Sequence, residues 1–581
     1  EGVAYGPNIS SLYGVKDAPD PWRAFPKAQV GADYEVSFPV NPADMSTDAE
    51  DEIACVRLLY RIGFGETVEG PVMTKAAAAD AMNGWVYTGT IPGAAFAKAG
   101  ELVRFAALIT DGKGRTWRSP SFCNPDDGYE WYGTIVAPGT AAGEGAESAN
   151  LQTFHLFADP DEVADTPGEM NTTALMNLDA DNPNFTTEKH PYGARVGVYD
   201  STTGLYYDHV RIDLRGHTSA NFVKKSHGLR FNKSQPLSCT DPATGTVVEE
   251  IRKSSFVSEY PDVSGVRQML AFKIFNDNGS PAPFHYPVRL NLNGRFYQLA
   301  YHSERFSDEL IEDCYGLDPL GYSYKNVGTF AAGNVLAITK KTPDDDHEDD
   351  LAVLKAFEAT LQPASSKTVV KSFDLPAWIN YVALERITGE RDGLCANTSA
   401  FYDVNGTDTW RPLAYDMNMS FGVYNTGIWQ DDPAMKDWSK AKGLAPTAEH
   451  LHPFAGGLKI GDDGNQAVEN VFQSAKFRRL YLRRLRTLMD KVLKAPDTAL
   501  ADTPAFQWAK DVADRIADDA ALDRALWMDT ADKIATGSAN WVWGDRHTEA
   551  WTVAEGWTDL WDNYVVPRRD YLFNEQTATP A

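Results

Sequence analysis

Short segments in which apolar and polar residues alternate fill the chain between residues 33 and 136. They include Tyr-Glu-Val-Ser-Phe at 34–38, Cys-Val-Arg-Leu-Leu-Tyr-Arg at 55–61 and Leu-Val-Arg-Phe-Ala-Ala-Leu-Ile at 102–109, with turn residues between them. A period of two is the pattern of strands that bury one face. We therefore predict a β-sandwich of the immunoglobulin or fibronectin type over residues 27–137, preceded by an irregular lead-in at 1–26.

A different composition separates this region from the rest of the chain. Residues 138–150 read Pro-Gly-Thr-Ala-Ala-Gly-Glu-Gly-Ala-Glu-Ser-Ala-Asn, a run of small and polar residues that is typical of a flexible linker. Because 581 residues exceed the size of one ordinary domain, we predict a second domain over residues 151–581.

Strands dominate the first part of that second region. Three hairpins are predicted from alternating segments joined by turn residues. They pair residues 210–214 with 226–231, residues 288–292 with 296–301 across Asn293-Gly294, and residues 399–404 with the segment from 409 onward across Asn405-Gly406.

Helices dominate the later part. Residues 374–388 carry apolar residues at helical spacing, with Asp374 as the N-cap, Pro376 just inside the helix and Gly389 at its end. Helical periodicity also runs through residues 472–493 and 505–528. Strands first and helices later indicate an α+β fold, in the order of a two-lobed kinase domain.

Composition narrows the function classes. Hydrophobic residues make up 43% of the chain and aromatic residues 12%, enough for large cores, and no apolar run is long enough to span a bilayer. A net charge of −27 opposes binding to nucleic acid, which requires dense Lys and Arg. The sequence contains no Gly-x-Ser-x-Gly elbow, Walker A loop or zinc motif, so a serine hydrolase, a P-loop ATPase and a zinc enzyme have no support.

Three side chains have the spacing of phosphoryl-transfer chemistry. Asp392 is followed by Asn397 and, further along, by Asp416. Protein kinases use such a set, in which one Asp takes the substrate hydroxyl proton while the Asn and the second Asp hold metal. The third predicted hairpin lies between them and would bring the three to one end of a small sheet. Asp and Asn beside Gly are also ordinary turn and cap residues, so the spacing alone is a weak signal.

A basic segment upstream offers a place for phosphate. Arg215, Lys224, Lys225 and Arg230 lie close together, and Gly216 adds accessible backbone N–H groups. Guanidinium, ammonium and backbone N–H groups all bind phosphate. An exposed basic hairpin that keeps a sheet edge soluble is the simpler alternative. In a chain this acidic, a local group of cations favours anion binding.

Glu304 has more than one interpretation. It ends the second predicted hairpin and precedes a predicted helix at 308–313. It would either pair with a phosphate-binding lysine or orient a nucleotide, or it would be an acidic residue at the start of that helix.

In this order, these motifs resemble the spore-coat protein H (CotH) family of secreted atypical protein kinases. The similarity spans about residues 150–575 and lies in several segments: Arg215-Gly216 with Lys224-Lys225-Ser226, Asn293-Gly294 with Tyr297 and Glu304, Asp392 with Asn397 and Tyr402, and Asp416 with Phe421-Gly422. Two positions depart from the family pattern. Tyr415 stands where Trp is usual, and Asn418 stands where a second acidic residue is usual.

The resemblance implies ATP-dependent phosphorylation of a hydroxyl on an extracellular or surface-layer protein, with Mg²⁺ or Mn²⁺. The implied roles are as follows: Asp392 as the catalytic Asp; Asn397, Asp416 and Asn418 at the metal; Arg215, Lys224 and Lys225 at the phosphates, with Lys225 as the first choice of lysine; and Glu304 at the nucleotide. Asn418 removes a charge from the metal site. A non-catalytic pseudokinase with a structural or adhesive role is therefore the main alternative, and a kinase for a small molecule or glycan is a third.

Secretion and cysteine pairing complete the expectations. The chain begins at Glu1 without Met, as a processed secreted protein would. Its five cysteines fit one or two disulfides, for which Cys55–Cys123 and Cys239–Cys314 are the expected pairs, with Cys395 left over as a small buried hydrophobe. The acidic runs at 344–350 and 462–463 are interpreted as solvated loops.

Overall fold

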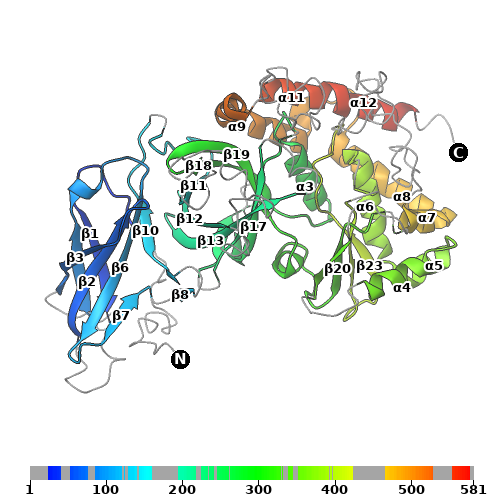
Figure 1. The fold of residues 1–581 in the computed structure, drawn as a ribbon. Coiled ribbons are helices and arrows are strands. Elements are labelled where there is room, and N and C mark those ends of the chain that lie inside the picture. Colours follow the sequence, from blue (N-terminus) through cyan, green and yellow to red (C-terminus); the bar gives the residue numbers. More distant parts are fainter. Residues whose placement is uncertain are drawn as a thin grey trace, which may run out of the picture.

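Three regions follow one another in the computed structural model of the chain (Figure 1). Two β-sheets at the N-terminal end are followed by a closed strand barrel, and then by helices that surround a small sheet. The structure describes residues 24–40, 53–75, 85–120, 123–124, 128–140, 143–159, 194–216, 224–232, 235–240, 245, 247–260, 262–328, 330, 338–343, 351–390, 393–394, 397–422, 465–527 and 552–575.

The two N-terminal sheets share one hydrophobic core. One consists of β1 (Tyr34–Val40), β5 (Trp85–Ile91) and β4 (Thr74–Lys75); the other runs β10 (Tyr132–Ile135), β6 (Leu102–Asp111), β2 (Ile53–Ile62) and β3 (Val68–Val72), with β7 (Thr116–Ser119) also paired to β6. Alternate residues of β2, Val56, Leu58 and Tyr60, enter this core because successive side chains of a strand point to opposite faces. The predicted strands are present, and the immunoglobulin or fibronectin type stays a prediction.

The barrel is built from seven of the described strands. Its order is β11 (Thr153–Ala158), β12 (Ala194–Asp200), β13 (Tyr206–Arg215), β14 (Ser226–Arg230), β17 (Lys253–Val257), β19 (Arg295–Glu304) and β18 (His285–Leu292). A parallel pairing of β11 with β18 closes it, while the other neighbouring pairs are antiparallel. Buried aliphatic and aromatic residues such as Val210, Leu229 and Val288 form its core.

Two hairpins of the barrel confirm the sequence predictions. β13 pairs with β14, with Arg215 opposite Ser226, and β18 pairs with β19, with Leu292 opposite Arg295. Asn293 (φ 47°) and Gly294 (φ 78°) both adopt the left-handed backbone conformation that a two-residue hairpin turn requires. The Asn-Gly pair is therefore explained by the turn geometry.

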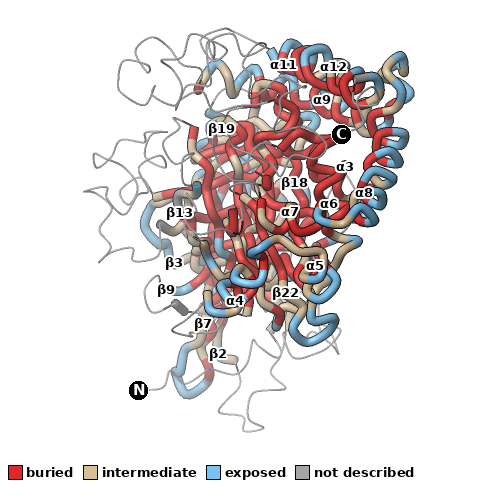
Figure 2. Tube along the Cα trace, turned by 90° about the vertical axis from the view of Figure 1, so that its right-hand side faces the viewer, coloured by how far each residue is buried: buried red, intermediate tan, exposed pale blue. Residues whose placement is uncertain are grey.

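The third region contains most of the described helices. They are α4 (Ala352–Thr360), α5 (Ser366–Ser372), α6 (Leu375–Thr388), α7 (Gln466–Phe472), α8 (Ala475–Leu488), α9 (Pro504–Trp527), α11 (Val553–Asp559) and α12 (Val566–Asp570), with α3 (Arg267–Asp277) packed beside the barrel. On α8, Phe477, Tyr481 and Leu485 are buried at a spacing of four residues, which places them on one face. Figure 2 shows the buried residues as a continuous interior and exposed residues along the outer side of the helices.

The central helix α6 confirms its predicted boundaries. The Asp374 carboxylate accepts a hydrogen bond from the backbone N–H of Ala377 (3.1 Å), so Asp374 is the N-cap. Gly389 ends the helix in the left-handed conformation (φ 62°), which Gly adopts without strain. Every residue from Trp378 to Thr388 is buried. In the sequence, the segment predicted to contain the catalytic Asp follows this buried helix.

A small sheet completes the third region. Its order is β21 (Thr339–Thr342), β20 (Tyr322–Lys325), β22 (Ser399–Tyr402) and β23 (Trp410–Leu413). The antiparallel pairing of β22 with β23 confirms the predicted hairpin. The connection between them is longer than the predicted two-residue turn, because Asp403 accepts hydrogen bonds from the backbone and hydroxyl of Thr407 and holds a wider loop.

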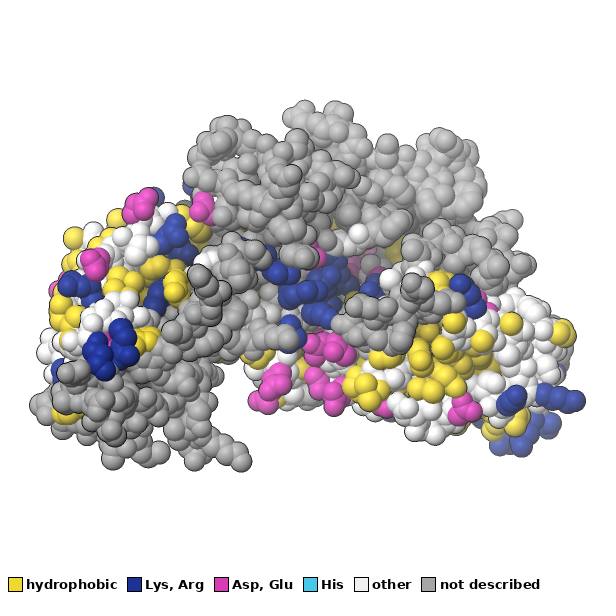
Figure 3. Space-filling view, turned by 60° about the horizontal axis from the view of Figure 1, so that its bottom comes forward, with side chains coloured by type: hydrophobic (Ala, Val, Ile, Leu, Met, Phe, Trp, Pro, Cys, Tyr) yellow, Lys and Arg dark blue, Asp and Glu magenta, His cyan; other side chains and the backbone are white. Residues whose placement is uncertain are grey.

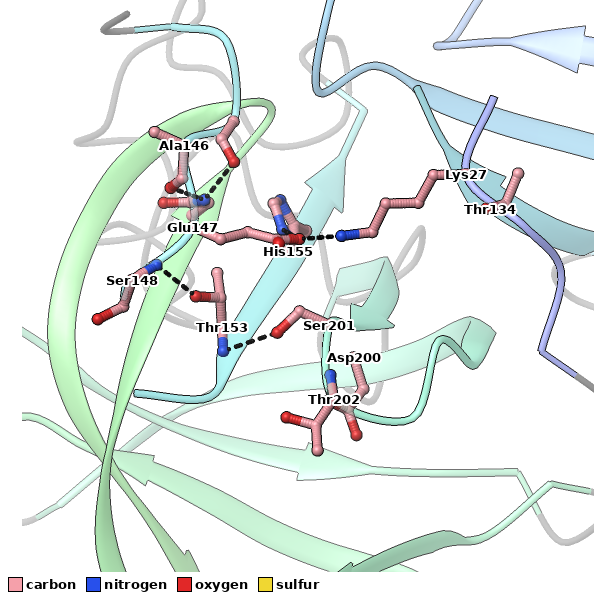
Figure 4. Close-up of polar contacts among 12 residues, drawn as sticks. Lys27, Thr134, Ala146, Glu147, Ser148, Thr153, His155, Asp200, Ser201 and Thr202 are labelled. Carbon is pink, nitrogen blue, oxygen red and sulfur yellow. Dashed lines mark hydrogen bonds and ion pairs between the residues drawn. The ribbon is translucent and has the colours of Figure 1, made fainter. Parts of the chain in front are cut away.

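Residues 143–150 lie between the N-terminal sheets and the barrel. Glu147 accepts a hydrogen bond from Lys27 (2.6 Å) and lies 3.2 Å from Nε2 of His155 (Figure 4). The Ser148 hydroxyl donates to Asp519 of α9 (2.6 Å). The sequence predicts a flexible linker from the small residues, but this part of the segment is bonded to both neighbouring regions. Small residues permit close packing as well as flexibility.

An apolar contact joins the N-terminal sheets to the barrel. Leu102 and Ile135 of the sheets pack with Phe157, Tyr199 and Tyr206 of the barrel. None of the described helices has the length and apolarity needed to cross a membrane.

The expected disulfide between Cys239 and Cys314 is wrong. Cys55, Cys239 and Cys314 are all thiols in the structure. Cys239 contributes to the barrel core, whereas the Cys314 thiol donates to Glu304 at 2.5 Å. Sequence proximity alone is a poor guide to pairing because a disulfide needs a specific geometry. Because Cys55 is also a thiol, the expected Cys55–Cys123 bridge is absent as well.

Candidate functional site

The hairpin β22–β23 brings Asn397 next to Asp416. Its register places Ser399 opposite Leu413, so the residues just before β22 meet those just after β23. The Asn397 side-chain amide lies 3.5 Å from the backbone oxygen of Asp416. This juxtaposition was expected from the sequence. Asp392, the third member of the expected set, lies outside the described residues, as do Cys395 and the acidic runs at 344–350 and 462–463.

The loop after β23 is fixed to the end of α6. The backbone N–H of Phe421 donates to the carbonyl of Thr388 (2.8 Å), and the Ser420 hydroxyl donates to Glu390 (2.8 Å). Asp416 itself has a left-handed backbone (φ 58°), an unusual conformation for a residue other than Gly. Asp416 and Asn418 are both half-buried, so their side chains retain access to solvent.

Arg215 reaches this loop from the barrel. Its Nη2 donates to the hydroxyl of Tyr415 at 2.8 Å, and the Tyr415 ring is buried against Phe306. Burial acts to raise the pKa of the Tyr415 hydroxyl, whereas the positive charges of Arg215 and Lys325 act to lower it. The net result is a pKa below the ordinary value of tyrosine. The hydroxyl is therefore surrounded by positive charge.

Five cations from separate segments make up this environment, and we call them the basic cluster: Arg215, Lys253, Arg305, Lys325 and Lys341. The Lys325 ammonium lies 4.6 Å from the centre of the Tyr415 ring. Burial, together with the charges of Lys325, Arg305 and Lys253, lowers the pKa of Lys341. Figure 3 shows Lys and Arg side chains gathered in a hollow of one face, with Asp and Glu beside them.

Two members of the basic cluster are partly neutralised by carboxylates. Nη1 of Arg305 lies 3.3 Å from Asp213, and the Lys253 ammonium lies 3.8 Å from Asp308. The pKa of Lys341 is lowered first by burial and then by its positive neighbours, which make an added proton costly. A group of cations that repel one another attracts anions, and a phosphate group would relieve that repulsion.

The structure separates the two predicted lysines. Lys224 is buried, and its ammonium pairs with Asp523 of α9 at 2.7 Å. Lys225 is half-buried. The two lysines therefore have different surroundings. The choice of Lys225 as the first lysine at the phosphates stays a prediction.

Glu304 lies at the end of β19 and is buried. Its Oε2 accepts the hydrogen bond from the Cys314 thiol, and burial raises its pKa to about 8. The other charges that act on it, Asp313 and Glu309, are also negative. Among the described contacts of Glu304 no lysine occurs, so its role at a nucleotide stays a prediction.

Glu259, which follows β17, is a further carboxylate that sequence reasoning missed. Its Oε1 accepts a hydrogen bond from Gln268 (2.9 Å) and lies 3.4 Å from Nε2 of His285. Burial raises the pKa of Glu259 to about 8; Asp262 and Asp416 add to the increase, while Lys224 and Arg215 oppose it. Glu259 therefore lies within electrostatic reach of both predicted parts of the site. No motif in the sequence marks it.

Few of the described side chains near Asp416 are able to bind a metal ion. Within the described ranges no three His, Cys, Asp or Glu side chains are grouped so that they hold a metal ion. Asp416 supplies one carboxylate, and Asn397 and Asn418 supply amide oxygens. Mg²⁺ is commonly held by one or two carboxylates together with water and substrate phosphates, so these oxygen donors fit a metal that arrives with a nucleotide.

A barrel and a helical region meet at a group of cations, an Asp and an Asn, in a protein of mixed α/β structure. Residues 212–498, just under half of the chain, match the family model for the CotH kinase protein. The resemblance expected from the sequence is thereby confirmed, and the match includes the whole basic cluster and Asp416. Among curated proteins, none matches the chain.

Proposed function

We propose that this protein transfers the γ-phosphate of ATP to a hydroxyl group of an extracellular or surface-layer protein. The observation that carries the proposal is the basic cluster beside Asp416 and Asn397, in a chain whose net charge is −27. The match of residues 212–498 to the CotH kinase family model supports an atypical kinase. Phosphoryl transfer depends mainly on positioning and charge neutralisation, which such a site supplies.

The proposed roles follow from position. Arg215 and Lys225 hold phosphate oxygens, because Arg215 reaches the Asp416 loop and Lys224 is already paired. Asp416, with Asn397 and Asn418, holds Mg²⁺ or Mn²⁺, and the metal would neutralise charge on the transferred group. Asp392 orients the acceptor hydroxyl and takes its proton. Secretion of the protein is part of the proposal.

A pseudokinase is the second candidate, and Asn418 favours it. An amide in place of a carboxylate removes one negative charge from the metal site and weakens binding of a divalent cation. Such a protein would retain the fold and act as a structural or adhesive component at the surface.

Incorporation of labelled phosphate from ATP, with Mg²⁺ or Mn²⁺, distinguishes the two candidates. The acceptors are the protein itself and generic protein substrates, and the variants are Asp416→Ala and, as a matched control, Asp497→Ala at an exposed turn. A kinase loses orders of magnitude of activity in Asp416→Ala and none in the control. Absence of incorporation, together with no thermal stabilisation by ATP and metal, would establish the pseudokinase.

A further inference from the structure

A pocket lies between β19, the loop from Ser258 to Gly265, and the helices α9 and α11. Its apolar wall includes Leu299, Tyr301, Ile516 and Trp527. The pocket and its open mouth together have a volume of about 590 Å³. The centres of water molecules fit into about 70 Å³ of this space. That is room for about five waters, so a ligand here would be small.

Glu259 lines this pocket and has an unsatisfied oxygen. The side chain is 6% exposed, and its Oε2 has no hydrogen-bond partner among the described residues. Oε1 is occupied by Gln268. A buried carboxylate oxygen without a partner is costly, so such a group calls for an explanation in terms of a ligand or a function.

The other charged groups of the pocket are already balanced. Lys224 pairs with Asp523 (2.7 Å), and Asp262 pairs with Arg267 (2.8 Å). Arg524 feels the opposite charges of Glu555 and Asp523.

Among the described residues no Lys or Arg forms an ion pair with Glu259, although the charges of Lys224 and Arg215 act on it. The basic side chain nearest to it in the described contacts is His285, at 3.4 Å. Burial and the charge of Arg215 lower the pKa of His285 to about 3, so the imidazole is neutral. Arg215 itself is bonded to Tyr415. With its pKa raised to about 8, Glu259 is mostly protonated at neutral pH in the empty pocket, and a cation bound beside it would favour the ionised carboxylate.

We infer that this pocket binds a small organic cation, a primary ammonium compound with a short apolar body, whose charged group pairs with Glu259. Aromatic side chains such as Tyr301 and Trp527 suit such ligands because their faces attract cations. A metal ion is disfavoured, because the described residues contain no cluster of three metal-binding side chains. The pocket adjoins the proposed phosphate site, because Lys224 lines it and the charges of Arg215 and Asp416 act on Glu259.

Binding of n-butylammonium to the full-length protein, measured by calorimetry without nucleotide, tests this inference. n-Butanol is the neutral probe of nearly the same size. We expect saturable binding of butylammonium and binding of butanol that is about tenfold or more weaker, because only the cation compensates the buried carboxylate. Equal binding of both probes would overturn the inference in favour of a neutral ligand, and so would absence of binding.

Two variants and one control locate the site. Glu259→Gln keeps the shape and removes the charge, so butylammonium should lose about tenfold or more of its affinity and bind no better than butanol. Ala520→Met fills the pocket from α9 and should weaken both probes, which covers the case in which the Glu259 variant fails to fold. Glu66→Gln, at an exposed loop, should change nothing. Unchanged butylammonium binding in Ala520→Met and Glu259→Gln would place the cation elsewhere and overturn the inference.

Discussion

Replacement of Tyr415 with Phe removes one hydroxyl from the centre of the basic cluster. In the wild type this hydroxyl accepts a hydrogen bond from Arg215 at 2.8 Å. Hydrogen bonds that involve a charged group contribute about 1.5–3 kcal/mol. Because Arg215 is half-buried and keeps contact with solvent, we expect a loss of about 1.5 kcal/mol, at the lower end of that range.

The same variant has a spectroscopic signature. Tyr415 has a lowered pKa, whereas burial raises the pKa of Tyr199, Tyr481 and Tyr564 to about 12. Absorbance of tyrosinate near 295 nm should therefore rise less below pH 10 in Tyr415→Phe than in the wild type, by the contribution of one residue.

Two outcomes would refute the reasoning about Tyr415. Titration curves that coincide below pH 10 would show that the basic cluster does not act on this hydroxyl. Equal stability of the variant and the wild type in denaturant would show that the bond to Arg215 contributes nothing. Arg215→Lys is the useful comparison, because it keeps the charge and removes the planar guanidinium. It should preserve most of the early titration.

Three further predictions concern other parts of the fold. Burial raises the pKa of Glu385 to about 8, so its contribution to stability is fully present below about pH 4.5 and is lost as the pH rises toward 8. As the pH rises between these values, denaturant melts should show the free energy of unfolding of Glu385→Gln increasing by several kcal/mol relative to that of the wild type. Parallel curves would contradict this. Asp374→Ala loses the cap of α6 and the ion pair with Arg411, about 1.5–2 kcal/mol together, whereas Asp374→Asn keeps the cap and should lose less. The Cys314 thiol, whose pKa burial raises strongly, should resist alkylation at pH 8 until the protein unfolds, as read by mass spectrometry; rapid labelling of the native protein would contradict the contact with Glu304.

Elements set by local signals were predictable from the sequence. The Asn293-Gly294 turn fixes the register of β18 and β19, and Asp374 and Gly389 mark the ends of α6. These features depend on residues within a few positions of one another, so the chain itself displays them. The meeting of Asn397 with Asp416 followed from the same logic, because a hairpin joins its two ends.

The basic cluster and Glu259 were not predictable in this way. Only Arg215 of the cluster lies in the basic segment that the sequence marks; the other four cations come from β17, the end of β19, β20 and β21. Those four lie far apart in the sequence, and each looks like an ordinary surface residue of its own segment. Glu259 gains its character from burial against α3 and β18. Burial is a property of the assembled fold, so no short pattern records it.

The two departures from the family pattern therefore differ in meaning. A Trp at position 415 offers only an indole N–H, which is a donor and accepts no hydrogen bond from Arg215. Tyr415 accepts that bond and keeps the guanidinium beside Asp416, so this departure is compatible with a phosphate site. Asn418 offers no comparable gain, because its neutral amide stands where the family has a carboxylate whose negative charge helps to bind the metal. The choice between an active kinase and a pseudokinase thus depends on whether Asp416 and the phosphates of a nucleotide hold the metal without a second carboxylate at position 418.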